Sequence, residues 1–585
     1  MARGTGVAAA ASAVALAVGA AVVATVAGRA QAPATPSPLA SYQPVTRDRL
    51  LSPDERDWLM IRRTYDGWGY SPLADITAAN VERMRLVWTR PTGVDRVHEA
   101  APIVNGGAMF ITAPNNIVIA LDAASGEVLW RYQRPRPKGA FVLHDTNRGV
   151  ALYGDKVFVA AGEAVLLALD ARTGKEVWTA NVADNKSAYY LTLAPLVADG
   201  KVLVGTSGGE FGIRGFISAF DPDTGKELWR TFMIPAPGEP GSDTWPKGEQ
   251  WRTGGAPVWV TGNYDPETNL AYFGTGNGGP WIGDQRPGDN LYVASTVALD
   301  VATGRIRGHF QYDPNESWDW DEVSPPIVVD YQRNGRTVKG LINVARDGYI
   351  WFLERFPDRI GFVEGKPFVT QNVYRSLDPV TGRPDVDPEH KPGTGKAASF
   401  CPSPHGGKNW PPVAFSPQTR LMYVPANNNL CGVMTGVAVR YERGRAFAGT
   451  RSGMPFLAPG ATHVGEVQAW NVDTGARAWT HAYQKTPNWG SMLVTGGGVL
   501  FTGGTNDRKI HAFDASTGAL RWEYQTTSGI VAPPTTFRVN GKQYLAVLAG
   551  WGGDPRGMQN TLNRIFPGEY PPVPEGGSIS VFALE

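Results

Sequence analysis

The chain has 585 residues, which by length alone would suggest about three or four domains. Its 55 basic and 54 acidic side chains leave a formal net charge of +1, so there is no electrostatic reason to expect nucleic acid or an anionic membrane surface as a partner. The 70 glycines, 46 prolines and 10% aromatic residues favour many short strands joined by turns over helical bundles.

The first 32 residues are typical of an export signal. Arg3 supplies a positive start, residues 7–28 are apolar, and Ala-Gln-Ala at 30–32 fits a small-residue cleavage site. A Pro-rich linker is expected over 33–55 and a periplasmic location for the mature protein. Because the apolar run is about 20 residues long, an uncleaved membrane anchor is the alternative.

One pattern recurs along the rest of the chain. It begins with Ala-x-Asp or Ala-x-Asn, continues with Thr-Gly or Ser-Gly, and ends in Trp four residues after the glycine. Apolar residues lead into a tight Asp-x-x-Thr-Gly turn, and a second strand ends on the aromatic residue. The copies span 120–130, 168–178, 219–229, 469–479 and 512–522, with a sixth at 298–308 that has Gly308 in place of Trp and a remnant near Asp378.

A repeat of about 45 residues with four strands is typical of a β-propeller blade. The pattern therefore predicts one all-β domain over 56–585 with seven or eight blades, in which each Trp packs against the next blade. Independent β domains explain the recurring Trp poorly.

Cys401 and Cys431 are the only 2 cysteines, and in an oxidising compartment they are expected to pair. No Cys-x-x-Cys-His motif is present, so the chain carries no covalently attached c-type haem.

Asp319 and Asp321 stand two residues apart in Ser-Trp-Asp-Trp-Asp. In an extended segment they would point to the same side, about 6–7 Å apart. The pattern alone leaves open whether they hold one metal, divide a proton and a cation between them, or face water.

With these motifs the sequence resembles the pyrroloquinoline quinone (PQQ) dependent alcohol dehydrogenases, the methanol/ethanol family of eight-bladed propellers. The resemblance runs from Asp57 to the C-terminus and includes Arg-Pro-Gly-Asp-Asn at 286–290 and the segment 400–412. It implies PQQ at the propeller centre with one cation beside it. The cation polarises the C5 carbonyl, and a carboxylate takes the alcohol proton as hydride moves to C5.

The resemblance also assigns the metal site. Asp319 falls on the catalytic base, and Glu210 and Asn277 fall on cation ligands, a set that Asp319 completes. Asp321 falls where lanthanide-using members carry an additional aspartate. A larger trivalent cation takes more oxygen ligands and is the stronger Lewis acid, so a lanthanide(III) ion is favoured, with Ca²⁺ as the alternative.

Eight further positions resemble contacts to PQQ, whose three carboxylates need cations and donors. Trp259 would form the floor under the planar ring and Arg346 would reach the quinone oxygens. A lone Arg or Trp would ordinarily be an ion-pair or packing residue, and only the shared context favours the functional reading. The set is Glu99, Arg148, Thr192, Ser207, Trp259, Arg346, Asn409 and Trp489.

Two cysteine positions bear on the same resemblance. Many members cover PQQ with two adjacent cysteines, but Val142 and Leu143 stand there in this chain, so an apolar cover near His144 is expected. Cys401 and Cys431 match a different, structural disulfide of the family.

The resemblance therefore implies a periplasmic enzyme that oxidises a small primary alcohol to an aldehyde and passes electrons to an external cytochrome c. The alternatives are a calcium enzyme acting on polyols, sugar alcohols or polymeric alcohols, and a non-catalytic propeller scaffold. Insertions at 231–255 and 432–465 are expected to wall the pocket, no nucleic acid partner is expected, and a homodimer stays open.

Overall fold

The computed structural model describes residues 37–585, so the expected signal segment lies outside the described residues. Within 37–585, no helix combines the length and apolar character needed to cross a membrane. Strands dominate this part of the chain, as predicted, and the α-helices are α1 (Arg47–Leu51) and α2 (Gly553–Ile565). Short 3-10 helices occur at Val81–Arg83, Asn185–Ser187, Gly209–Phe211, Ser242–Thr244, Gln250–Thr253, Gly283–Gln285 and Pro388–His390.

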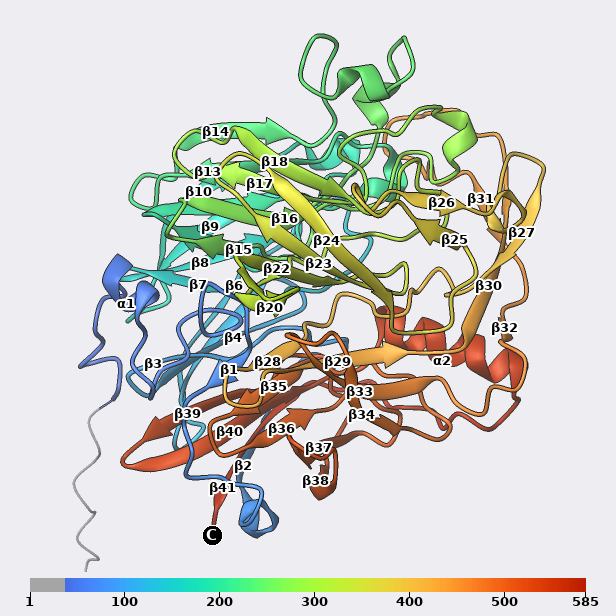
Figure 1. The fold of residues 1–585 in the computed structure, drawn as a ribbon. Helices are drawn as coiled ribbons and strands as arrows, with labels where there is room; N and C mark the ends of the chain where they lie inside the picture. Colours follow the sequence, from blue (N-terminus) through green and yellow to red (C-terminus); the bar gives the residue numbers. More distant parts are fainter. Residues whose placement is uncertain (1–36) are drawn as a thin grey trace, which may run out of the picture. The chain divides into compact units, whose positions relative to one another are not determined.

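The described residues form eleven sheets. In eight of them four antiparallel strands lie side by side, and Figure 1 shows these eight sheets succeeding one another along the chain. The first four consist of β3 (Ile103–Asn105), β4 (Ala108–Ala113), β5 (Ile117–Asp122) and β6 (Val128–Gln133); β7 (Ala151–Tyr153), β8 (Lys156–Ala161), β9 (Val165–Asp170) and β10 (Glu176–Asn181); β11 (Leu196–Ala198), β12 (Lys201–Gly205), β13 (Phe216–Phe220) and β14 (Glu227–Phe232); and β15 (Asn263–Asp265), β16 (Leu270–Gly274), β17 (Ser295–Asp300) and β18 (Ile306–Gln311).

The next three consist of β19 (Ile327–Val328), β22 (Gly340–Val344), β23 (Tyr349–Arg355) and β24 (Ile360–Pro367); β28 (Ala414–Ser416), β29 (Leu421–Asn427), β33 (Gly465–Asn471) and β34 (Arg477–Ala482); and β35 (Met492–Thr495), β36 (Val499–Thr502), β37 (Lys509–Asp514) and β38 (Leu520–Gln525), with β1 (Tyr70–Ser71) parallel to β35. Smaller sheets are formed by β20 (Tyr331–Arg333) with β21 (Arg336–Val338), by β25 (Tyr374–Leu377) with β26 (Pro384–Val386), and by β27 (Ala397–Phe400), β30 (Leu430–Gly436), β31 (Thr450–Ser452) and β32 (Phe456–Leu457).

The eighth sheet joins the two ends of the described chain. It consists of β2 (Met84–Pro91), β41 (Ser578–Leu584), β40 (Lys542–Ala549) and β39 (Thr535–Val539). Met84 is paired with Leu584 and Pro91 with Ser578. Pairing the first long strand with the last one leaves fewer free sheet edges, as in a closed ring.

The repeat tryptophans join neighbouring sheets, as the sequence predicts. The Trp130 indole donates a hydrogen bond of 2.9 Å to the Ala171 carbonyl. A Cβ placed on Gly174 would lie only 2.6 Å from the Trp130 ring. The same contact between a Trp and the turn glycine of the next repeat pairs Trp88 with Gly126, Trp178 with Gly225, Trp229 with Gly304, and Trp479 with Gly518.

In the two irregular repeats, at 298–308 and near Asp378, other residues take the place of the Trp–Gly contact. Gly308 replaces Trp because a Cβ there would lie 2.7 Å from the Arg359 Cα. The remnant near Asp378 keeps its turn glycine, Gly382, which is packed by Phe362 in place of Trp.

Part of the segment expected to be a linker packs against the domain. Leu39, Tyr42, Val45 and Leu50 are all buried in the main hydrophobic cluster. The Val45 backbone exchanges two hydrogen bonds, of 2.9 and 2.8 Å, with Gly154 in the β7–β8 turn. The prediction of a linker is therefore wrong for residues 39–50, because their apolar side chains are buried against the domain.

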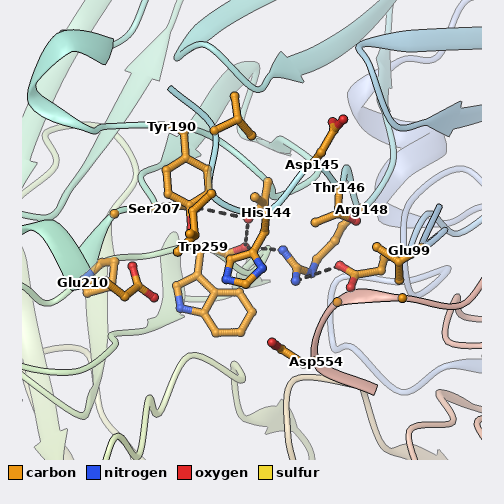
Figure 2. A pocket seen from close by; sticks show the side chains of 18 of the residues that line it. Glu99, His144, Asp145, Thr146, Arg148, Tyr190, Ser207, Glu210, Trp259 and Asp554 are labelled. Carbon is orange, nitrogen blue, oxygen red and sulfur yellow. Dashed lines mark hydrogen bonds and ion pairs between the residues drawn. The ribbon is translucent and has the colours of Figure 1, made fainter. Parts of the chain in front are cut away.

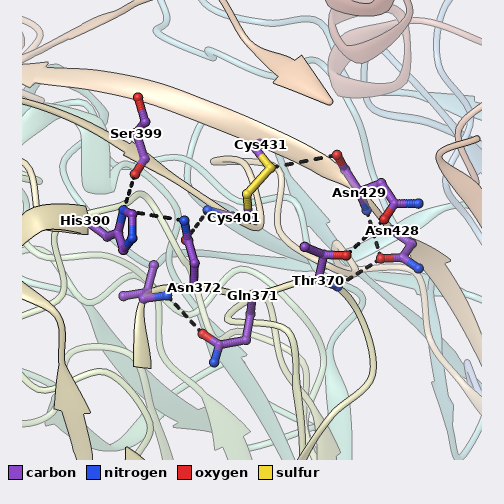
Figure 3. Close-up of a disulfide and its surroundings, with 10 residues drawn as sticks. Thr370, Gln371, Asn372, His390, Ser399, Cys401, Asn428, Asn429 and Cys431 are labelled. Carbon is purple, nitrogen blue, oxygen red and sulfur yellow. Dashed lines mark hydrogen bonds between the residues drawn. A yellow bond between two sulfur atoms is a disulfide. The ribbon is translucent and has the colours of Figure 1, made fainter. Parts of the chain in front are cut away.

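The predicted disulfide between Cys401 and Cys431 is present (Figure 3). Cys401 directly follows β27 and Cys431 lies in β30, its partner strand. Both cysteines are buried, so the bridge fastens the base of the 432–465 insertion to the sheet.

The Trp–Gly contacts can be tested by Gly174→Ala. Gly335→Ala is the matched control, because Gly335 has a similar positive φ of 76°, against 67° for Gly174, and open space around its Cβ position. Both variants should lose about 1–2 kcal/mol from the left-handed backbone. Gly174→Ala should lose about 1–3 kcal/mol more, because its methyl group displaces the Trp130 ring.

The measurement is the denaturation midpoint in guanidinium chloride for the wild type and both variants. An equal loss in the two variants would mean that the indole contact does not contribute to stability.

Candidate active site

A cavity of about 820 Å³ collects most of the residues that the sequence singled out. Its walls come from segments far apart in the chain, between Asp95 and Glu575, so it depends on several sheets at once. The predicted residues among its lining are Glu99, Arg148, Thr192, Ser207, Glu210, Trp259, Asp319, Asp321 and Arg346. Figure 2 shows the part around Trp259.

A buried ion pair forms one side of the cavity. Arg148 Nη2 lies 2.8 Å from Glu99 Oε2, and both side chains are buried. The Arg148 guanidinium also lies between two indoles, 4.8 Å from the ring centroid of Trp259 and 4.5 Å from that of Trp410. This packing holds a positive charge in a fixed place at the cavity wall.

The Trp259 indole forms a second wall, with two hydroxyl groups beside it. Thr192 Oγ1 lies 3.1 Å from Ser207 Oγ and donates a hydrogen bond of 3.3 Å to the Trp259 carbonyl. An aromatic plane flanked by hydroxyl groups and an arginine suits a flat, acidic ligand.

Three carboxylates of the cavity wall, those of Glu210, Asp319 and Asp321, lie close to the amide of Asn277, which is buried behind the lining. Asn277 connects two of them: its backbone N–H donates to Asp321 Oδ1 at 2.8 Å, and its Nδ2 donates to Asp319 Oδ1 at 2.9 Å. The Trp259 Nε1 donates to Asp321 Oδ2 at 2.5 Å. Glu210 sits on the short 3-10 helix Gly209–Phe211, and its Oε2 is buried without a hydrogen-bond partner, as is Asn277 Oδ1.

Asp319 and Asp321 are not on an extended strand. Asp319 has a φ of +66°, in the left-handed region, so the expectation of two side chains on one face of a strand is wrong. The turn is fixed by Glu316, whose Oε1 accepts from the backbone N–H groups of Trp318 and Trp320 at 2.6 and 2.9 Å. The two carboxylates instead come together because both contact Asn277.

Burial raises the pKa of all three carboxyl groups. The pKa of Asp319 lies well above its usual value because of burial and then repulsion from Asp321. Burial also raises the pKa of Glu210 and of Asp321, although His144 and Arg346 respectively oppose the effect. A cation among these oxygens would stabilise all three charged forms.

The donor set fits such a cation. Carboxylate and amide oxygens are hard ligands of the kind that Ca²⁺ takes. Close approach depends on glycine, since a Cβ on Gly209 would lie 2.5 Å from Asn277 Oδ1 and one on Gly276 would lie 2.9 Å from Asp321 Oδ2. Across residues 37–585, however, no three acidic, histidine or cysteine side chains are already arranged to hold a metal ion.

The other predicted contacts divide into two groups. Arg346 lines the cavity and donates to the Asp319 carbonyl at 2.7 Å. Asn409 and Trp489 are buried but do not line it; the Trp489 Nε1 donates to Met558 Sδ at 3.3 Å. The structure therefore does not bring these last two to the cavity surface.

The residues that wall the cavity also differ from those predicted. Neither 231–255 nor 432–465 contributes a residue to the cavity lining. The second insertion lies behind the site, where the Phe447 N–H donates to the Glu210 carbonyl at 2.6 Å. Val142 and Leu143 do line the cavity beside His144, as the cysteine replacement suggested.

Several lining residues were not identified from the sequence. Thr146 and Tyr190 each stand two residues before a predicted contact, Arg148 and Thr192, and that spacing could have indicated them. Trp281 stands four residues after the predicted ligand Asn277 and Asp145 directly follows His144, whereas Arg136 and Asp554 belong to no repeat or motif that would have identified them.

Known proteins provide an independent comparison. The family described as glucose/ethanol/alcohol dehydrogenase, β-propeller domain, with PQQ in its name, matches residues 58–369 and 482–545. The quinoprotein alcohol dehydrogenase PedH of Pseudomonas putida is 38% identical over 514 residues, 83% of this chain and 85% of that protein. The chain belongs to the family of PQQ-dependent alcohol dehydrogenases.

Two further relatives support this family assignment. The quinoprotein alcohol dehydrogenase PedE of Pseudomonas putida is 34% identical and covers 96% of this chain and 94% of its own. The structure of a europium-containing methanol dehydrogenase superposes with a TM-score of 0.86 at 34% identity, over 92% of this chain and 100% of that one. The predicted family, the β-propeller fold and the enzyme class are thereby confirmed.

The family's cofactor can be compared with the residues present. PQQ is flat and carries three carboxylates; the cavity offers the Trp259 plane, the fixed Arg148 guanidinium and the hydroxyl groups of Thr192 and Ser207. These residues fit the group, and the oxygens of Glu210 and Asn277 fit a cation next to it.

The loop that carries Glu99 predicts a pH dependence. His98 is buried, with Nδ1 2.7 Å from the Arg96 carbonyl and Nε2 2.8 Å from Thr92 Oγ1. A neutral ring satisfies both partners, with Nδ1 donating to the carbonyl and Nε2 accepting from the hydroxyl group. Burial accordingly lowers the pKa of His98 from 6.5 to about 4.

Since the folded pKa lies below the unfolded one, the unfolded state binds a proton first, and stability falls as the pH falls from 6.5 to about 4. The loss should approach about 1.4 kcal/mol per pH unit inside that window. His98→Gln cannot titrate, so the difference in unfolding free energy between wild type and variant should shrink on acidification. A difference that is constant across the window would contradict a neutral, buried His98.

Proposed function

We propose that this protein is a periplasmic enzyme that oxidises a primary alcohol to the aldehyde with PQQ and one cation and delivers the electrons to an external cytochrome c. The observation that supports it most is the single cavity in which the Trp259 plane and the Arg148–Glu99 pair adjoin the acidic group around Asn277.

PQQ, held by Trp259, Arg148, Thr192 and Ser207, would supply the hydride acceptor, and a cation held at Glu210 and Asn277 would supply Lewis acidity beside it. The chain supplies the base. Asp319 would take the hydroxyl proton, because its carboxylate lines the cavity beside the cation site. Arg346 holds the backbone of that residue through the Asp319 carbonyl.

Glu210, Asn277, Asp319 and Asp321 would hold the cation. We favour a lanthanide(III) ion, since three carboxylates in one buried site suit a trivalent charge and a europium-containing methanol dehydrogenase shares the fold. Asp321 would have to exchange at least one of its two hydrogen bonds, to Asn277 or Trp259, for the ion. A calcium enzyme acting on polyols is the second candidate, and the polar cavity favours it.

The role of Asp319 is tested by Asp319→Asn, which keeps the shape and removes the charge. We expect kcat in a dye-linked alcohol assay to fall by about 100- to 10,000-fold, the usual contribution of a positioned base. Asp358→Asn is the control, since Asp358 is exposed and lies outside the cavity. An unchanged kcat in Asp319→Asn, with PQQ still bound, would exclude Asp319 as the base.

The choice of cation is tested with Asp321→Ala and Asp321→Asn. Apoprotein is reconstituted with PQQ and either lanthanum or calcium, and PQQ binding is followed separately by quenching of tryptophan fluorescence. We expect activity with lanthanum in the wild type only. Asp321→Asn still offers an oxygen to Asn277, so it should retain PQQ binding while losing the lanthanum-supported rate.

Equal calcium-supported rates in wild type and both variants, with no lanthanum activity, would make Asp321 dispensable. That outcome would favour the calcium enzyme and direct the substrate search to polyols.

A further inference from the structure

Asp554 is a cavity carboxylate that neither the proposed cofactor site nor the proposed cation site uses. It lies in the first turn of α2, after Gly552 and Gly553. Figure 2 shows its carboxylate directed into the cavity, on the far side of Trp259 from Tyr190.

Three arginines near it are already paired. Arg148 is paired with Glu99 at 2.8 Å, Arg136 with Asp145, and Arg556 with Glu575. For Asp554, by contrast, the part of the chain from 37 to 585 supplies neither a hydrogen bond nor an ion pair, and its electrostatic surroundings act only at longer range.

Asp554 is charged at neutral pH. Burial alone would raise its pKa, but the basic groups around it, including the guanidinium groups of Arg346 and Arg148, bring the pKa below its ordinary value. A charged carboxylate without a direct partner, facing a cavity that a small molecule must enter, is a ready acceptor for a donor on that molecule.

The helix offers a simpler role for an acidic residue at this position. A carboxylate in the first turn interacts favourably with the helix dipole. The carboxylate makes no capping hydrogen bond, however, and the dipole does not require a carboxylate that faces the cavity.

We infer that Asp554 selects the substrate: it accepts a hydrogen bond from a second donor, a hydroxyl or an ammonium group, at the far end of a short primary alcohol. This inference rests on the proposed alcohol oxidation. The reacting hydroxyl would lie at Asp319 and the second donor at Asp554, both on the wall of the same cavity.

The test compares n-propanol with its ω-hydroxy and ω-amino derivatives, using enzyme reconstituted with PQQ and the active cation. The quantity is the ratio of kcat/KM for each derivative to kcat/KM for n-propanol, in wild type, Asp554→Asn and Asp554→Leu. Asn560→Leu is the control, because it adds the same side chain to an exposed position of α2 outside the cavity.

We expect Asp554→Leu to lower both ratios by at least about tenfold, the equivalent of about 1.4 kcal/mol. Asp554→Asn should lower the ratio for the ω-amino alcohol more than the ratio for the diol, since the amide still accepts a hydrogen bond but carries no charge. Asn560→Leu should leave both ratios unchanged. Ratios that are the same in wild type and Asp554→Leu would overturn the inference, even with full alcohol oxidation.

A binding measurement separates this inference from the proposed function. tert-Butanol and its β-amino derivative have no hydrogen on the carbinol carbon and cannot be oxidised, so their dissociation constants are measured by tryptophan fluorescence whether or not the enzyme turns over. We expect the amino derivative to bind more tightly to wild type than to Asp554→Leu, and tert-butanol to bind both alike. Equal affinities for the amine would again overturn the assignment, whereas absent turnover with preserved amine selectivity would overturn only the proposed oxidation.

Discussion

Negative charge concentrated around Asn277 is the constraint on which the rest of this site depends. Asp319 and Asp321 both contact that one residue, and Glu210 stands near enough for Asp321 to oppose its ionisation. Three carboxylates in a water-poor site repel one another, and their raised pKa values express that cost. The proposed cation would offset this repulsion and would give the buried oxygens of Glu210 and Asn277 the partner that they lack.

The fold holds these like charges close together. In neighbouring sheets a tryptophan packs on a turn glycine, and pairing of the early strand β2 with the last strand, β41, closes the series. Loops from distant parts of the chain are thereby held around one cavity. Different contacts fix the loops that carry the acids. Glu316 fixes the turn of Asp319, and the Phe447 backbone supports the turn of Glu210. Preorganisation of this kind keeps the charged groups in place before any ligand binds.

Sequence patterns predicted the repeated parts of this structure well. The Asp-x-x-Thr-Gly turn and its Trp recur, so their contact could be inferred from spacing, and the disulfide followed from there being two cysteines. The packed segment at 39–50 was missed because its few apolar residues show no periodicity. The cavity wall was misassigned because the length of an insertion does not tell where it folds, and 432–465 in fact supports Glu210 from behind.

The site was predictable only in part. Family resemblance identified the acids but not the left-handed turn at Asp319, which depends on the side chain of Glu316 three residues earlier. Asp554 could not be predicted as a cavity residue from the sequence, since it belongs to no repeat and reaches the cavity only through the position of α2. Residues that act through tertiary placement alone leave no local pattern to detect.

The most direct measurement is X-ray diffraction from crystals grown with PQQ and lanthanum, recorded where lanthanum scatters anomalously. The account predicts one strong anomalous peak among the oxygens of Glu210, Asn277, Asp319 and Asp321, with the planar cofactor lying against Trp259. A cofactor bound elsewhere, or no peak among these four residues in crystals grown with lanthanum or with calcium, would contradict it.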